Sequence, residues 1–284
     1  MCPNAIDITA IKPDCPWFDL LDIFDLTTIS LAENLTLNVE FLLNNFLEIF
    51  NNNHRLMTAK GYPIKFVSQE NLPAGEAYES FIAKTGSIPT RNNYHDFFNG
   101  LIWLNFPQTK LTFNALHAKD ISEHGVTATR TSLRNALTLF DENGGVVVSS
   151  DYSLLQALQQ FNWQDALYHT RGLWQADTPQ AAFFPVGHAL LEKLMTPRKN
   201  ITSHTLLLHV TPCWFEQSLS EQRHKLDNFV AQLFAKTCVD SKIFQPLPVM
   251  GLPTYTTDNQ LADFYHDKTV YRAPRAYLAP IFDD

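Results

Sequence analysis

Apolar residues recur at helical spacing through the first part of the chain. This pattern predicts a helix over 39–50, which the asparagines at 51–53 end. Further helices are predicted over 75–84, from Asn92 or Asn93 to about 105, and from Pro107 to about 117. Asparagine is a good N-cap and proline suits the first turn of a helix, so these residues place the last two starts.

The pattern changes after residue 135. Short apolar runs at 136–140 and 146–148 flank an Asp-Glu-Asn-Gly-Gly segment, which predicts a β-hairpin near 136–149. The next predicted elements are a helix capped by Ser150 or Asp151, a short helix over 187–195 and a strand over 204–210. Ser218 and Glu221 form a capping box before another amphipathic run. The proline-rich segment 244–284 is predicted to wrap the domain as loops.

These elements predict an α+β fold, helix-rich, with a small antiparallel sheet that includes the hairpin. We expect a single compact domain over 1–284, with 1–35 as an N-terminal extension that packs on it. Only 10 glycines occur in 284 residues, and no glycine- or serine-rich linker separates two halves.

Charge and hydropathy narrow the class of protein. The chain has 29 acidic and 21 basic residues and a net charge of -8, so no nucleic-acid partner is expected. No window of 18 mainly apolar residues occurs, so no membrane span is predicted. The first residues do not combine a basic segment with a following apolar one, so no signal peptide is predicted. We therefore expect a soluble, cytoplasmic protein without a membrane partner.

The segment 89–99 is the first candidate for a functional site. If a helix begins near residue 93, its free N–H groups and the Arg91 guanidinium could bind an anion, with His95 and Asn99 one turn apart. The alternative is structural: Asn93 and Asp96 cap the helix, and Arg91 pairs with a carboxylate.

The next helix carries three polar residues on one face. Lys110, Asn114 and His117 are spaced i, i+4 and i+7, and Phe113 and Leu116 flank them. Such a stripe borders the core and needs partners, because buried polar groups are costly when unpaired. An anionic substrate, a metal at His117 or a structural hydrogen-bond network would each satisfy it.

A third candidate lies in the helix predicted over 187–195. His188 and Glu192 are an i, i+4 pair, a spacing that lets two side chains reach one metal, although weak surface ion pairs share it. Asp141 and Glu142 lie at the tip of the predicted hairpin, where functional carboxylates are often found, but Asp-Glu-Asn-Gly is also ordinary turn chemistry and this assignment is preferred.

The segments 89–107, 136–144, 187–193, 246–253 and 264–270 carry a resemblance to a known family. Their motifs include His-Asp-Phe-Phe-Asn-Gly-Leu-Ile-Trp-Leu from His95 and Gly-His-Ala-Leu-Leu-Glu-Lys from Gly187. With these motifs the chain resembles the mainly proteobacterial domain-of-unknown-function 3025 family. The resemblance implies one domain with a core of about 78–275, and it implies no activity, cofactor or catalytic residue.

The leading hypothesis is an enzyme, a metal-assisted hydrolase of a small anionic or phosphorylated substrate. The predicted catalytic residues are His95, Asp96 and His117, with Asp96 as general base or as a partner of the metal ligands. The predicted substrate-binding residues are Arg91, Asn99, Lys110 and Asn114. A divalent metal ion is predicted as cofactor, held by His95, His117, His188 and Glu192. The alternative is a non-enzymatic module that binds a small anion, a nucleotide or a protein of unknown identity.

Overall fold

The computed structural model describes residues 6, 11, 15–18, 38–51, 55–125, 130–236, 239–274 and 277–284. The chain groups into two compact units: 1–14, 18–137 and 223–238 form the first, and 15–17, 138–222 and 239–284 form the second. Helices and mixed sheets build these units, which confirms the helix-rich α+β class. The predicted extension over 1–35 lies mostly outside the described residues, and the single-domain boundary stays a prediction.

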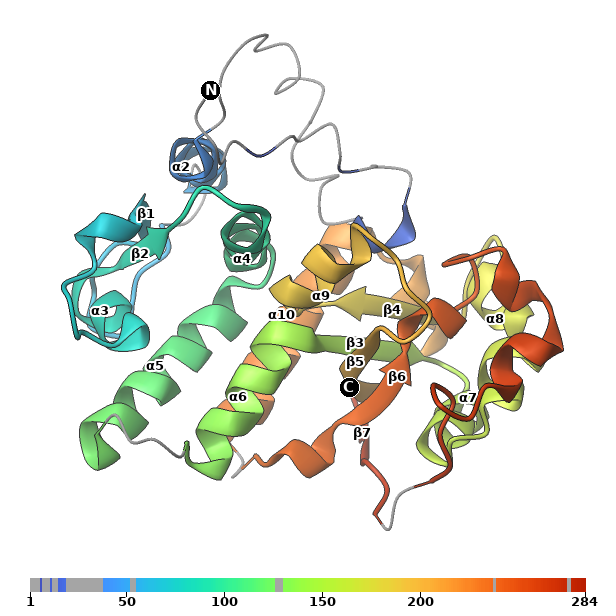
Figure 1. The fold of residues 1–284 in the computed structure, drawn as a ribbon. Coiled ribbons are helices and arrows are strands. Elements are labelled where there is room, and N and C mark those ends of the chain that lie inside the picture. Colours follow the sequence, from blue (N-terminus) through green and yellow to red (C-terminus); the bar gives the residue numbers. More distant parts are fainter. Residues whose placement is uncertain are drawn as a thin grey trace, which may run out of the picture. The chain divides into compact units, whose positions relative to one another are not determined.

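The first unit contains most of the helices predicted in the first half of the chain (Figure 1). Its elements are α2 (Val39–Asn51), β1 (Lys65–Ser68), the short helix η3 (Gln69–Asn71), α3 (Tyr78–Thr85), β2 (Ser87–Thr90), α4 (Tyr94–Asn105) and α5 (Pro107–His124). β1 and β2 form a two-stranded parallel sheet. Two further helices, α6 (Ser132–Asn143) and α10 (Leu219–Lys236), each contribute residues to both units.

Local signals place the start of α4 and its packing on α2. The Asn93 side chain accepts a hydrogen bond from the Asp96 N–H, as expected of an N-cap. Asn92 instead accepts from the N–H of Val39, the first residue of α2. Gly100 allows the close approach of the two helices, because a Cβ atom there would lie 2.2 Å from the Leu43 side chain.

The second unit contains a five-stranded mixed sheet with strand order β4-β3-β5-β6 and β7 paired to β5. Its strands are β3 (Gly144–Ser149), β4 (Ala181–Pro185), β5 (Thr202–His209), β6 (Gln245–Pro248) and β7 (Ile281–Asp283). β3 and β5 are parallel, as are β5 and β7, whereas the pairs β3–β4 and β5–β6 are antiparallel. β3 is buried along its whole length, as expected of a central strand.

The hairpin predicted near 136–149 is wrong. Residues 132–143 form α6, and β3 begins directly after it at Gly144. Ala136, Leu137 and Phe140 are buried at helical spacing, which the short apolar run concealed. β3 pairs with β4 and β5 from later in the chain, so the sheet is mixed and not simply antiparallel.

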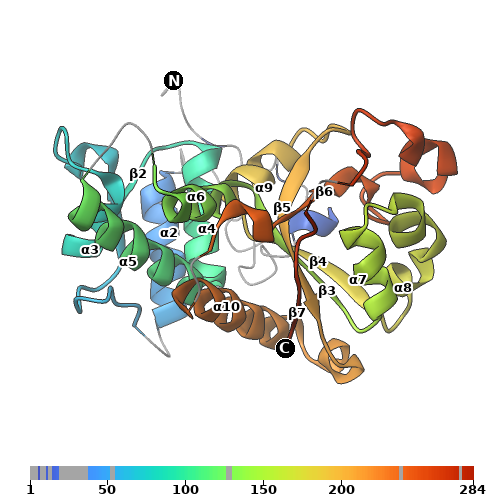
Figure 2. The ribbon, with the colours of Figure 1, turned by 90° about the horizontal axis from the view of Figure 1, so that it is seen from below.

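Helices cover the sheet of the second unit. They are α7 (Tyr152–Gln159), the π-helix η4 (Gln164–His169), α8 (Arg171–Gln175), α9 (His188–Leu194) and the short helices η5 (Pro212–Glu216), η6 (Ser241–Ile243), η7 (Val249–Gly251), η8 (Asp258–Gln260) and η9 (Ala262–His266). α7 packs against β3 and β5, and α8 against β4 (Figure 2). Asp151 caps α7, and Ser218 and Glu221 form the predicted capping box of α10.

The segment 244–284 contains more regular structure than predicted. It contributes β6 and β7 to the sheet, because both strands find partners along β5. Within the part of the chain that the structure describes, no helix combines the length and apolar character needed to cross a membrane.

Candidate metal centre

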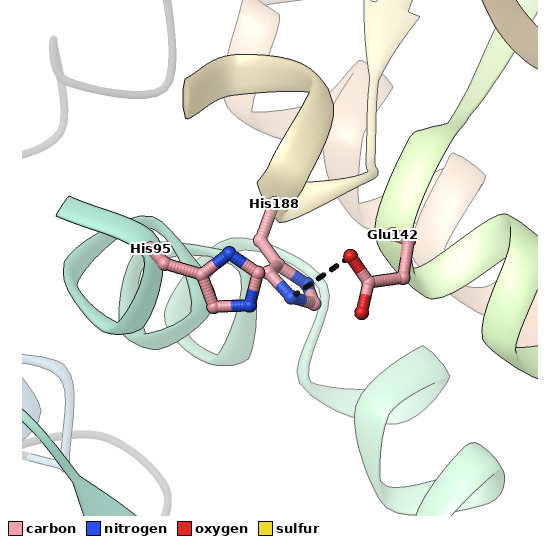
Figure 3. A group of neighbouring side chains, drawn as sticks. All are labelled: His95, Glu142 and His188. Atoms are coloured by element: carbon pink, nitrogen blue, oxygen red, sulfur yellow. Dashed lines mark ion pairs between the residues drawn. The ribbon is translucent and has the colours of Figure 1, made fainter. Parts of the chain in front are cut away.

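A histidine lies between two carboxylates in the second unit. His188, the first residue of α9, is buried with 5% of its surface exposed. Its Nδ1 atom lies 3.8 Å from Oδ2 of Asp141. Its Nε2 atom lies 3.9 Å from Oε2 of Glu142, and Figure 3 shows this ion pair. Asp141 and Glu142 belong to the last turn of α6. One imidazole and two carboxylates concentrate negative charge, which favours a cation at this place.

The backbone between α6 and α9 explains why these side chains meet. The N–H groups of Val186 and Gly187 both donate to the carbonyl oxygen of Gly144, at 3.0 and 2.8 Å. A Cβ atom on Gly187 would lie 2.4 Å from the nitrogen of Gly144 and 2.6 Å from Cα of Asn143. Only glycine permits this approach, so Gly187 sets the distance between His188 and the end of α6.

Side chains from two further elements hold the end of α6. The Lys193 ammonium group of α9 donates to the Asn143 side-chain oxygen. The Ser203 hydroxyl of β5 donates to the Asn143 carbonyl oxygen at 3.1 Å. The carboxylates of Asp141 and Glu142 therefore start from a backbone that is fixed on both sides, as a preformed site requires.

The spacing between Nε2 of His188 and Oε2 of Glu142 suits two ligands of one ion. Metal bonds to histidine nitrogen and carboxylate oxygen are each about 2.1 Å, which places two tetrahedral ligands about 3.4 Å apart. The observed 3.9 Å needs a shift of only about 0.5 Å to reach that value. Asp141 lies beside the other ring nitrogen, where a carboxylate commonly orients a metal-binding histidine.

His188 was predicted as a metal ligand from the sequence, whereas its two carboxylate neighbours were assigned to a turn. The periodicity of Ala136, Leu137 and Phe140 was the signal that could have placed Asp141 and Glu142 at a helix end. Glu192, the predicted partner of His188, lines an open cavity together with Lys193, Thr196 and Arg198. Its role as a metal ligand stays a prediction.

In the first unit, the predicted substrate-binding residue Arg91 forms an ion pair with the predicted catalytic residue Asp96. The Asp96 carboxylate accepts from the Arg91 backbone N–H at 2.6 Å and from its guanidinium at 2.9 and 3.1 Å. The Asp96 side chain is 9% exposed, and that of Arg91 is 57% exposed. These are the contacts of the structural alternative, and the catalytic and substrate-binding roles of the two residues stay predictions.

The polar stripe of α5 is buried, as its flanking apolar residues indicated. Lys110, Asn114 and His117 are each less than 10% exposed. The Lys110 ammonium group donates to the Asn99 side chain at 2.9 Å, and its Nζ atom lies 5.5 Å from the centre of the Trp103 ring. The stripe thus contacts α4 through Lys110.

Helix α3 supplies the remaining partners of this network. The Asn114 amide donates to the Glu79 carbonyl oxygen at 2.8 Å and to its carboxylate at 2.7 Å. Asn99 donates to the Tyr78 hydroxyl at 3.2 Å. Three helices are therefore joined by polar side chains, which is the arrangement of the structural network weighed for these residues. Substrate binding by Asn99, Lys110 and Asn114 stays a prediction.

Comparison with known proteins gives one match. A family model described as protein of unknown function (DUF3025) matches residues 64–275. This match begins before the family-like core predicted at about 78 and ends at the predicted residue 275. No curated protein and no solved structure matches the chain.

Proposed function

The chain belongs to the DUF3025 family of proteins of unknown function, and on that premise we propose its function from its side chains. The proposal is a metal-assisted hydrolase that acts on a small anionic, phosphorylated substrate. The observation that supports it is the buried His188 with carboxylates 3.8 and 3.9 Å from its two ring nitrogens.

In this proposal Nε2 of His188 and the Glu142 carboxylate bind one divalent ion. Asp141 would orient the imidazole so that Nε2 serves as the metal ligand, because a carboxylate at Nδ1 favours the proton on that nitrogen. A bound divalent ion lowers the pKa of a coordinated water towards about 7 and makes hydroxide available for attack on a phosphoester. The ion also attracts an anionic substrate to a protein that is itself acidic.

The role of His95 as a further ligand stays a prediction from the sequence. His95 lies in the first turn of α4 and is half-buried, and histidine nitrogen is a common ligand of catalytic divalent ions. His117, the other predicted histidine ligand, lies in the middle of α5 and is buried.

The test begins with metal content. Untagged protein purified without chelator is analysed for transition metals, then stripped and titrated with Zn²⁺ and Mn²⁺ by calorimetry. We expect one ion per chain, and we expect His188→Ala to weaken binding by more than about 100-fold. His224→Ala is the control, since His224 is exposed on α10. Equal metal affinity of wild type and His188→Ala would contradict the site.

Turnover distinguishes the enzyme from the non-enzymatic alternative. The metal-loaded protein is assayed against a panel of phosphomonoesters and phosphodiesters, with His188→Ala and His95→Ala in parallel. Hydrolysis that requires both histidines supports the hydrolase. Stoichiometric metal without turnover of any phosphoester would favour a module that binds an anion or a nucleotide through the metal.

A further inference from the structure

We propose that a second site, a cavity beside β5 and β6, binds a small planar aromatic molecule that carries a negative charge. The cavity has a volume of about 530 Å³ and is lined entirely by residues of the second unit. Its size falls within the range of about 300–1,000 Å³ that is typical of small-molecule sites. None of its lining residues belongs to the metal centre.

Two neighbouring strands form one wall of the cavity. Thr202 and His204 of β5 line it, and their partners Pro248 and Pro246 of β6 line it as well. These four residues alternate along their strands, so they lie on one face of the sheet. The prolines have no N–H group to satisfy, and they therefore offer rigid apolar surface to a ring.

Aromatic side chains that follow α7 form another wall. Phe161 and Trp163 line the cavity, with ring centres 5.3 Å apart and an edge-to-face arrangement. Phe161 has a φ of 62°, a left-handed conformation that costs a bulky residue energy. The chain thus accepts local strain where it turns between these two rings, which is common beside binding sites.

The loop 269–273 lines another side of the cavity and contains the one arginine among the described lining residues. Trp163 Nε1 donates to the Arg272 carbonyl oxygen at 2.8 Å, which ties this loop to the aromatic wall. Arg272 and Ala273 line the cavity from the loop. The nearby Asp267 carboxylate pairs with Lys199 at 3.2 Å, so its charge is compensated.

The charges of the lining favour an anion. The residues that line the cavity include Arg272 and His204, and none of the described ones is an aspartate or a glutamate. The Arg272 Nε atom donates to the carbonyl oxygen of Thr269, another lining residue, at 3.3 Å, which leaves the other guanidinium N–H groups to the proposed anion. Asn200, Thr202 and Thr269 add hydrogen-bonding groups. Aromatic and proline walls with one guanidinium suit a flat ring that bears a carboxylate or a similar group.

The probe is 2-naphthoate, titrated into the full chain by calorimetry beside neutral 2-naphthamide and non-aromatic cyclohexanecarboxylate. Ala273→Trp fills the cavity from an exposed loop position, and Arg272→Gln removes the guanidinium charge. Lys268→Gln is the matched control, since Lys268 is exposed in the same part of the chain and does not line this cavity. Thermal unfolding verifies that each variant is folded.

We expect 2-naphthoate to bind the wild-type protein and the Lys268→Gln variant equally. Binding should fall by about tenfold or more in Arg272→Gln and be lost in Ala273→Trp. The amide and the cyclohexane compound should each bind at least about tenfold more weakly than 2-naphthoate. Undetectable binding of 2-naphthoate at millimolar concentration, or binding that Ala273→Trp leaves intact, would overturn the proposal.

Discussion

The polar network of α3, α4 and α5 and the cluster around His188 differ in the distances between their polar atoms. In the first unit, Lys110 donates to Asn99 at 2.9 Å and Asn114 donates to Glu79 at 2.7 Å, which are ordinary hydrogen-bond lengths. In the second unit, both carboxylates lie almost 4 Å from the nearest nitrogen of His188. The first cluster joins helices directly, whereas in the second the separation between His188 and Glu142 is close to that of two ligands of one ion. Spacing therefore distinguishes a structural network from a candidate ligand site better than residue type does.

The largest expected effect is a loss of metal affinity, tested by changing one glutamate in each cluster. Glu142→Gln should weaken Zn²⁺ binding by about 100-fold, because it removes a charged ligand, whereas Glu79→Gln should leave metal affinity unchanged. Calorimetric titration of both variants, prepared identically, measures the difference. Similar losses in the two variants would mean that spacing does not separate the clusters.

A substitution in the first unit should lower stability and leave metal affinity unchanged. Asn114→Ala removes the donor to Glu79 and leaves a buried acceptor with one partner fewer, so the free energy of unfolding should fall by about 1–3 kcal/mol. Urea denaturation measures this change. Asn135→Ala is the control, because Asn135 is exposed on α6 and its loss should cost less than about 0.5 kcal/mol. A stable Asn114→Ala with reduced metal binding would reverse the assignment.

Asp141 should have a smaller effect than Glu142, since it lies beside the ring nitrogen that does not face the ion. Asp141→Asn keeps the size of the side chain and removes its charge, and we expect metal affinity to fall by about tenfold. Titrating Asp141→Asn and Glu142→Gln under the same conditions ranks the two carboxylates. A greater loss from Asp141→Asn would exchange their roles.

The smallest expected effect is a pH dependence of stability that comes from Asp227. This buried carboxylate accepts hydrogen bonds of ordinary length, like those of the first cluster. Asp227 accepts from the backbone N–H groups of Gln108 and Thr109 at 2.9 and 2.7 Å. Burial raises the pKa of Asp227 above its ordinary value of 3.8, although these N–H groups act in the opposite direction. The folded protein therefore keeps this proton to higher pH than the unfolded chain does.

This shift predicts the sign of a pH dependence. The contribution of Asp227 to the free energy of unfolding should decrease as pH rises from 3.8 through the raised pKa of the folded state. Asp227→Asn cannot titrate, so the stability of wild type relative to this variant should decline over the same pH interval. Urea denaturation at several pH values measures it. A relative stability of the wild type that increases with pH would show that the hydrogen bonds outweigh burial.

The starts of α4 and α7 were predictable from the sequence because capping is local, whereas α5 continues to His124, beyond its predicted end near 117. Asn93 and Asp151 each bond to N–H groups within three residues, so the chain nearby contains the whole signal. The partners of β3 were not predictable, because its register with β5 joins residues 60 positions apart, as in Gly144 and His204. A short apolar run after a glycine pair fits a hairpin equally well until these distant partners are known.

The candidate site was predictable only in part for the same reason. His188 follows a glycine at the start of an amphipathic run, and both features are visible in the sequence. Its carboxylate neighbours depend on the contact between Gly187 and the end of α6, which joins residues more than 40 positions apart. An error in one element, the supposed hairpin, was enough to remove Asp141 and Glu142 from the predicted site.

Asp227, which accepts hydrogen bonds from the first turn of α5, also determines when the first unit can finish folding during synthesis. Gln108 and Thr109 depend on Asp227, which the ribosome adds 118 residues after Thr109. The segment 138–222 of the second unit has then already been translated, because it precedes Arg223 in the chain. The N-terminal unit therefore cannot finish folding before much of its neighbour has emerged, in contrast to the usual order in which domains fold from the N-terminus.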